Sequence, residues 1–290
     1  MTNPTKIAVA ATFALAVAFY APAIAQSPAS APSPSPSASA TPSGPSDPCG
    51  SLLSIVNRPS FGTGVCTVRT GHFDIENGYT NTVTTGPGGG NTVVYPQSLI
   101  RLGTFDPHLD FELGVPSFNV SSVGGSVLSG WNDLNVGAKY ELGYTSNALW
   151  GVNGVVTVPS GIHGFTAGNA QFTGNFNWGY TINSVLGVSG TLGFNAFSAN
   201  NAAGVAQSYF AFAPTILMSA ALPGGPSQVS AEYAYFSSAG PNLGSKSWFD
   251  FIYARDFGSH VQVDVEYGFS PTSIGGQKQH YVGAGLSFMN

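Results

Sequence analysis

Charge is what this sequence has least of. Only 7% of its 290 residues are charged, 8 Lys and Arg against 13 Asp and Glu. Soluble domains carry about 25% charged residues, because a surface that faces water needs them. The shortage disfavours a soluble enzyme, and a net charge of −5 with no basic patch disfavours a nucleic-acid-binding protein. The 43% hydrophobic content instead fits a chain whose outer surface faces lipid.

Sequence signatures of catalysis are missing as well. The chain contains no G-x-S-x-G, P-loop or dinucleotide fingerprint and no cluster of metal ligands. His163 follows Ser160 closely in an expected loop, but one such pair in a loop is common by chance. We therefore expect no enzyme, no cofactor and no metal site.

Cysteine is limited to two residues, Cys49 and Cys66. There is no C-x-x-C motif and no neighbouring His, so reactive thiols or a metal site have little support. In an exported protein a lone pair at this distance is most simply one disulfide. We expect it to close an N-terminal hook, residues 49–66.

Long apolar runs are confined to the N-terminus. Residues 1–25 combine Lys6, an apolar stretch and the small-residue site Ala23-Ile24-Ala25, which predicts a signal peptide; an uncleaved membrane anchor is the alternative. Residues 26–48 consist almost wholly of Ser, Pro and Ala, which predicts a disordered linker in the periplasm. A docking motif for a periplasmic partner is the alternative there.

From residue 67 to 290 the dominant pattern is alternation of apolar and polar residues. Along 260–269, Val261, Val263 and Val265 alternate with Gln262, Asp264 and Glu266. Successive strand side chains point to opposite faces, whereas a helix repeats every three to four residues. Twelve such runs predict strands at 67–79, 92–104, 107–118, 133–143, 148–158, 170–181, 185–197, 206–219, 227–236, 247–257, 260–269 and 279–288.

The connections between these runs alternate between long and short, and the strand number is even. Both features are typical of outer-membrane barrels, which have long external loops and short periplasmic turns. The fold class expected is therefore all-β, a transmembrane antiparallel β-barrel of about 12 strands in the outer membrane, with 119–132 and 237–246 among its external loops. A β-sandwich is the alternative, but it needs more surface charge than this chain has.

Aromatic residues mark the expected strand ends and the C-terminus. The last run closes on Phe288, like the terminal strand that such barrels present to the barrel-assembly machinery, although Met289 and Asn290 follow it. Amphipathic rings favour the headgroup zone. Candidates for this girdle are Tyr79, Trp131, Tyr144, Trp150, Tyr180, Trp248 and Tyr267.

Two motifs resemble a known family. Asp133-Leu134-Asn135-Val136-Gly137-Ala138-Lys139-Tyr140 and the later Pro159-Ser160-Gly161 are similar to the D-L-x-x-G-x-K-Y and P-[ST]-G core of outer-membrane transporters named for the meta-cleavage pathway of phenol degradation. The resemblance implies a barrel of about this size that admits hydrophobic or aromatic small molecules.

If the apolar parity faces lipid, the opposite parity lines the lumen. The charged and titratable candidates for that lining are Asp74, Glu76, Arg101, His108, Asp110, Glu112, Asp133, Lys139, Glu141, Glu232, Asp250, Asp264 and Glu266. They line a water channel or pair across a filled interior, since twelve strands lie between filled and open barrels. An excess of acids favours cations or neutral solutes over anions.

The sequence therefore predicts an outer-membrane channel for passive uptake of small, hydrophobic or aromatic molecules. Its expected partners are outer-membrane lipid, the barrel-assembly machinery and a small-molecule solute, and nucleic acid is not among them. The alternative is a structural or anchoring barrel with a plugged lumen, whose linker and hook contact periplasmic material.

Overall fold

The computed structural model describes residues 47–200 and 205–290. The expected signal peptide and all of the expected linker except Asp47 and Pro48 lie outside the described residues. Within the described part of the chain, no helix has the length and apolar character needed to cross a membrane.

The described chain consists of one short helix and fifteen strand segments. The helix α1 spans Leu52–Ile55. The strands are β1 (Phe73–Thr85), β2 (Gly90–Tyr95), β3 (Ser98–Gly103), β4 (Leu109–Val115), β5 (Phe118–Val123), β6 (Ser126–Trp131), β7 (Leu134–Tyr144), β8 (Ala148–Val158), β9 (Gln171–Thr181), β10 (Leu186–Asn200), β11 (Ala206–Ala221), β12 (Ser227–Phe236), β13 (Lys246–Phe257), β14 (Val261–Phe269) and β15 (Lys278–Met289).

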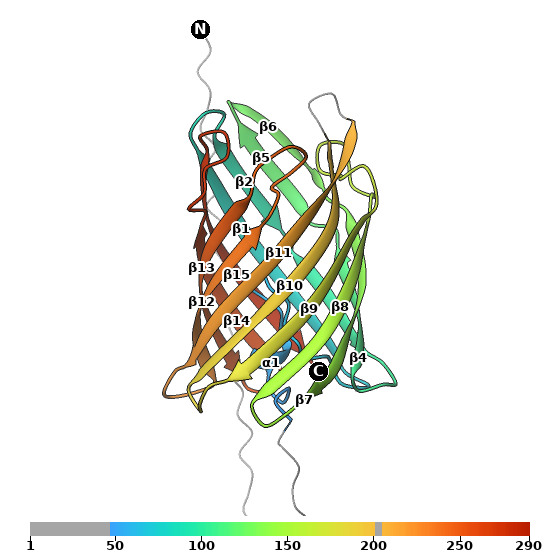
Figure 1. Ribbon diagram of the computed structural model, residues 1–290, viewed down its shortest axis with the longest axis vertical. Helices are drawn as coiled ribbons and strands as arrows, with labels where there is room; N and C mark the ends of the chain where they lie inside the picture. The colour runs from blue at the N-terminus through green and yellow to red at the C-terminus, as the bar shows by residue number, and fades with distance from the viewer. Residues whose placement is uncertain (1–46, 201–204) are drawn as a thin grey trace, which may run out of the picture. The chain divides into compact units, whose positions relative to one another are not determined.

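These segments form a closed antiparallel barrel of 12 strands (Figure 1). Three barrel strands are each interrupted once, between β2 and β3 at Pro96, between β4 and β5 at Pro116, and between β6 and β7 at Asn132. Proline has no N–H to donate to a neighbouring strand, so it interrupts a ladder where it occurs. The ring closes where β1 pairs with β15, with Asp74 opposite Met289. The prediction of an all-β, twelve-stranded barrel is confirmed.

Two expected boundaries are wrong. The first strand begins at Phe73 rather than at residue 67. Val68, within the expected strand 67–79, is fully buried against Cys49, Ile55 and Cys66 instead. The expected external loop 119–132 is the hairpin of β5 and β6, which turns at Gly124 and Gly125. In these two strands the alternation is interrupted by Ser121-Ser122 and by Val127-Leu128, so the hairpin was not recognised from sequence.

The two ends of the barrel differ. At one end the turns contain three to five residues, as at 145–147 and 258–260, and the other end carries loops such as 159–170 and 237–245. Figure 1 shows α1 and the C-terminus at the short-turn end, and β5 and β6 rising at the opposite end. Among the described strands, β6 pairs only with β5, and the loop 159–170 meets its other edge, where the Ile162 N–H donates to the Trp131 carbonyl at 3.0 Å.

The barrel wall separates apolar from polar side chains residue by residue. On β14 the exposed fraction is 38% for Val263 and 49% for Val265, but 2% for Gln262 and 0% for Asp264. Because neighbouring residues of a strand point to opposite faces, the valines form the outer surface and the polar residues face the lumen. A barrel with apolar side chains outside and a polar interior is suited to a lipid bilayer.

This arrangement gives a direct test of the outer face. We expect Val263→Arg to impair barrel assembly, because an arginine on the lipid face near the bilayer midplane costs roughly 2–4 kcal/mol. Heat-modifiable migration of the purified protein on gels measures assembly, with Val263→Leu as the matched control. An arginine variant that assembles as completely as the leucine variant would show that Val263 does not face lipid.

Candidate functional site

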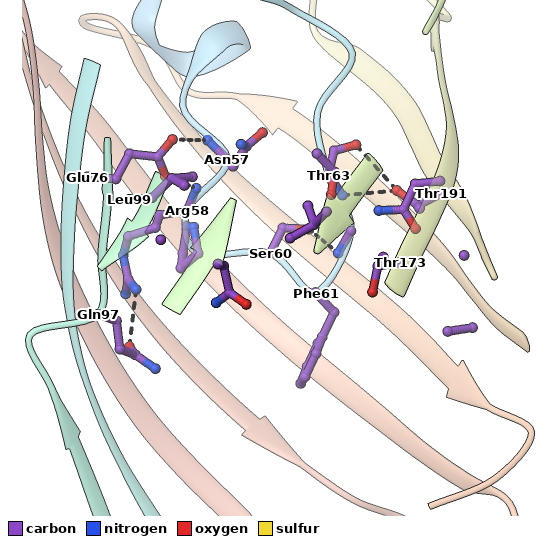
Figure 2. A pocket seen from close by; sticks show the side chains of 18 of the residues that line it. Asn57, Arg58, Ser60, Phe61, Thr63, Glu76, Gln97, Leu99, Thr173 and Thr191 are labelled. Carbon is purple, nitrogen blue, oxygen red and sulfur yellow. Dashed lines mark hydrogen bonds between the residues drawn. The ribbon is translucent and has the colours of Figure 1, made fainter. Parts of the chain in front are cut away.

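The hook, residues 49–66, lies inside the barrel and forms the candidate site with the lumen wall. Its tip is held by one carboxylate of β12, that of Glu232. Glu232 accepts hydrogen bonds from the backbone N–H groups of Phe61 at 2.8 Å and Gly62 at 2.9 Å, and from the Ser60 hydroxyl at 2.9 Å. Two strands away on the same part of the wall, the Thr63 N–H donates to the Thr191 hydroxyl of β10 at 2.9 Å (Figure 2). The tip therefore lies against β10, β11 and β12.

A second carboxylate holds the hook just before its tip. Glu76 on β1 accepts the N–H groups of Asn57 at 3.0 Å and Arg58 at 2.9 Å. The Arg58 guanidinium in turn lies 3.6 Å from Asp264 and 3.7 Å from Glu266, both on β14. Charge-assisted hydrogen bonds of this kind are stronger than neutral ones. The hook thus contacts acidic residues of β1 and of β14.

Arg101 on β3 is the centre of the buried charge. Its side chain is fully buried and lies 2.6 Å from Asp110 and within 3.8 Å of Asp74, Glu76 and Glu112. It also donates to two carbonyl groups of the hook, those of Ile55 and, at 2.7 Å, Cys66. Buried charges require such partners because removal from water is costly. Arg101 therefore links the wall acids to the hook backbone.

Lys139 on β7 is the second fully buried cation. Its ammonium donates to the Asn57 side-chain oxygen at 2.7 Å and lies 3.6 Å from Glu112. Lys139 is part of the first family-like motif, and Asp133 at the start of that motif has a different role. Asp133 accepts the N–H groups of Gly161 at 2.8 Å and Ala167 at 2.7 Å, and so fixes the loop that carries the second motif. The two motifs are in direct contact.

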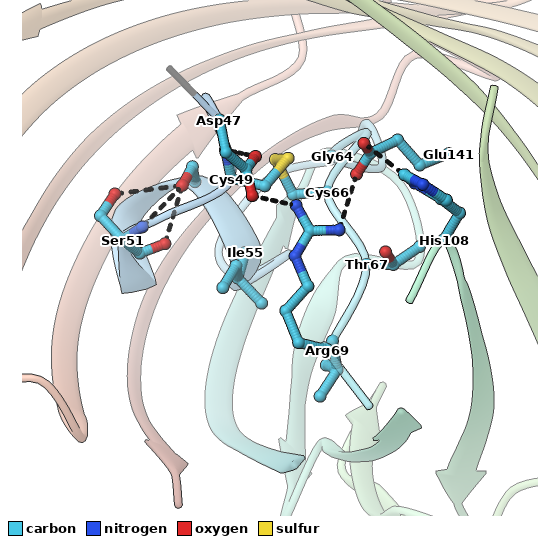
Figure 3. Close-up of a disulfide and its surroundings, with 12 residues drawn as sticks. Asp47, Cys49, Ser51, Ile55, Gly64, Cys66, Thr67, Arg69, His108 and Glu141 are labelled. Atoms are coloured by element: carbon cyan, nitrogen blue, oxygen red, sulfur yellow. Dashed lines mark hydrogen bonds and ion pairs between the residues drawn. A yellow bond between two sulfur atoms is a disulfide. The ribbon is translucent and has the colours of Figure 1, made fainter. Parts of the chain in front are cut away.

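The disulfide predicted from the cysteine count is present, since Cys49 and Cys66 are bonded (Figure 3). Closing a loop of this size stabilises the fold by about 3 kcal/mol through the unfolded state. Beside it, the Arg69 guanidinium pairs with Asp47 and lies 3.6 Å from Glu141. These contacts fix both ends of the hook at the short-turn end of the barrel.

Eleven of the thirteen residues proposed from the sequence for the lumen fall into three groups. Asp74, Glu76, Asp110, Glu112 and Lys139 surround or adjoin Arg101, and Glu232, Asp264 and Glu266 contact the hook or its arginine. His108 and Glu141 lie together at the short-turn end, 3.4 Å apart. Asp133 holds the loop, and Asp250 is buried opposite Glu232 in the ladder.

Two features of the site were not anticipated. The hook supplies backbone N–H donors and Arg58 to the lumen acids, and no pattern in residues 49–66 indicates this. Trp248, a girdle candidate, is 92% shielded and faces inward, where its ring is 5.8 Å from that of Phe61 and 5.4 Å from that of Tyr281. Trp248 and Asp250 are two residues apart on β13, so their side chains share a face, and this spacing could have predicted that Trp248 faces inward.

The hook divides the lumen into two cavities. An outer cavity of about 740 Å³ reaches Thr82, Thr157 and Phe236 toward the loop end of the barrel. An inner cavity of about 270 Å³ reaches Leu149 and Gln228 near the short turns. Asn57–Ser60 and Gly62–Thr63 line both cavities. The tip of the hook is therefore the partition between them.

Comparison with solved structures finds further barrels. The chain is similar to an outer-membrane channel from Pseudomonas putida F1 at 10% identity, over 78% of this chain and 97% of that one, with a TM-score of 0.60. The NanC porin is 8% identical over 74% of this chain and 98% of its own, with a TM-score of 0.49. The CymD monoaromatic hydrocarbon channel is 8% identical over 77% and 89%, with a TM-score of 0.43.

No protein-family model matches the chain, and no curated protein sequence is similar to it. The resemblance to transporters of the meta-cleavage pathway therefore stays a prediction. At 10% identity, the likeness to the Pseudomonas putida channel shows a shared fold, that of an outer-membrane β-barrel.

Proposed function

We propose that this protein is an outer-membrane channel for passive uptake of small hydrophobic or aromatic molecules. The observation that carries the proposal is the pair of cavities in series, separated only by the tip of a hook inside a closed barrel. The structural neighbour from Pseudomonas putida F1 is described as an outer-membrane channel, which supports both the location and the role.

An aromatic cluster in the outer cavity supports the class of solute. The Phe61 ring at the tip of the hook is 38% exposed, and it lies 6.0 Å from the Tyr281 ring and 6.3 Å from the Phe236 ring. All three line the outer cavity together with Trp248. Aromatic rings prefer edge-to-face or offset contacts with one another. A monoaromatic solute fits this surface, and the resemblance of the two motifs points to the same class.

The buried ion pairs favour a second candidate, an anchoring barrel with a permanently plugged lumen. Arg101 and Lys139 bind the hook from two strands, and Glu76 and Glu232 bind it from two others. A hook that never moves would leave no route from the outer to the inner cavity. Uptake measurements separate the two candidates.

We expect cells that produce this protein to take up radiolabelled toluene faster than cells that lack it. Thr173→Trp should slow this uptake, because Thr173 lines the outer cavity and an indole there removes space for the solute. The matched control is Phe172→Trp, which places the same side chain on the outer face of β9, where Phe172 is 55% exposed. Equal uptake with and without the protein would favour the anchoring barrel.

A further inference from the structure

The inner cavity lies on the short-turn side of the tip of the hook. It lies between the hook and the wall formed by β8 to β14, and its volume is about 270 Å³. A dry apolar cavity of about 150 Å³ is sufficient to bind benzene in another protein. The inner cavity therefore has room for one substituted six-membered ring or a molecule of similar size.

Much of its lining is apolar. The hook contributes Leu53, Val56 and Val65, and the wall contributes Leu149 and Ile252, of which Ile252 is 5% exposed. Cavities of this composition bind molecules whose greater part is apolar, with a few polar groups that set the orientation.

Two polar side chains in this lining have no partner. The Ser230 hydroxyl oxygen on β12 and the Gln262 side-chain oxygen on β14 are buried and make no hydrogen bond to any described residue. The two residues are 7% and 2% exposed. Buried polar groups almost always have a hydrogen-bond partner, so each of these two oxygens is a position at which a ligand hydroxyl can pair.

Charge is already neutralised in this cavity. Among the described residues that line it, the charged ones are Arg58 and Glu232. Glu232 is occupied by the tip of the hook, and the Arg58 guanidinium faces Asp264 and Glu266. A charged ligand would have to leave water without a free counter-charge, which is unfavourable.

We propose that the inner cavity binds a small neutral molecule with an apolar body and one hydroxyl group, held by Ser230 or Gln262. A hydroxyl both donates and accepts, so it pairs with the serine hydroxyl and with either end of the glutamine amide. This inference rests on the proposed function, since it gives the solute a second binding position on the periplasmic side of the hook. Sites that hydrogen-bond a ligand hydroxyl discriminate against the analogue that lacks it.

The test compares benzyl alcohol with toluene, two probes with the same carbon skeleton that differ by one hydroxyl group. Calorimetric titration of the full chain in lipid nanodiscs, with empty nanodiscs subtracted, gives both affinities without any variant. We expect benzyl alcohol to bind more tightly than toluene, and benzoate not to bind. Equal affinities for the alcohol and the hydrocarbon would overturn the proposal.

Two variants and one matched control locate the binding. One of the two variants Ser230→Ala and Gln262→Met should weaken benzyl alcohol binding about threefold to tenfold, the range expected for one hydrogen bond, and so identify the residue that holds the hydroxyl. Toluene binding should stay unchanged. Ser287→Ala is the control, because Ser287 is also fully buried and unpartnered and pairs with Gln262 in the ladder, but does not line the cavity. Unchanged binding in both variants, or a loss in the control as large as in the weaker-binding variant, would overturn the proposal.

The two proposals fail in different ways. If toluene uptake responds to Thr173→Trp but benzyl alcohol binding ignores Ser230 and Gln262, the inner site is wrong and the channel remains. If benzyl alcohol binds as expected but the protein does not accelerate uptake, the site remains and the channel is wrong.

Discussion

Removal of residues 47–66 should raise the single-channel conductance several-fold in planar bilayers. The tip of the hook is the partition between the two cavities, and its backbone fills the lumen where β1, β10 and β12 hold it. Without it, a polar twelve-stranded lumen is free to fill with water, and pore width and lining determine conduction. The acid excess of the wall should make the open pore prefer cations.

The matched control is a chain lacking residues 27–43, a stretch of similar size in the Ser/Pro/Ala-rich region that leaves the hook intact. We expect its conductance to equal that of the full chain. If removal of the hook leaves conductance unchanged, then the barrel wall closes the lumen, and the hook is not what blocks ion flow.

The barrel could be predicted from the sequence, because the pattern that identifies each strand lies within that strand. Each strand alternates between lipid and lumen, so Val263 and Asp264 reveal their faces without reference to any other strand. The number of alternating runs then gives the strand count. Closure of the barrel follows because every backbone group in hydrocarbon needs a hydrogen-bond partner. The pattern fails in β5 and β6, where Ser121-Ser122 and then Val127-Leu128 interrupt the alternation.

The disulfide-closed hook was predicted, but its place inside the lumen was not, because what holds it there is mostly backbone. Glu76 and Glu232 each accept two backbone N–H groups, and Asp110 accepts that of Val68 at 2.8 Å. Every residue but proline carries such a donor, so no residue type marks these positions. The sequence shows more inward-facing acidic residues than inward-facing cations. Backbone N–H groups of residues 57–68 donate hydrogen bonds to three of these acidic side chains.

The second large effect is expected at Arg101. Arg101→Met should lower the free energy of unfolding by roughly 3–5 kcal/mol, the cost of breaking a buried ion pair from one side. It leaves Asp74, Glu76, Asp110 and Glu112 buried around an apolar side chain, and it removes two hydrogen bonds to the hook. Urea unfolding in lipid vesicles, followed by tryptophan fluorescence, measures the loss.

Arg255→Met is the matched control for this loss, because Arg255 lies on β13 but is exposed on the outer surface beside the Phe257 ring. Exposed substitutions of this kind usually change stability by no more than about 0.5 kcal/mol. Adding Asp110→Asn to Arg101→Met should recover part of the loss, since it removes the carboxylate charge that lay 2.6 Å from the arginine, and residues in contact are not additive. An Arg101 variant as stable as the Arg255 variant would mean that Lys139 and the hook amides suffice to neutralise the wall. Arg101 would then not be needed to hold the hook.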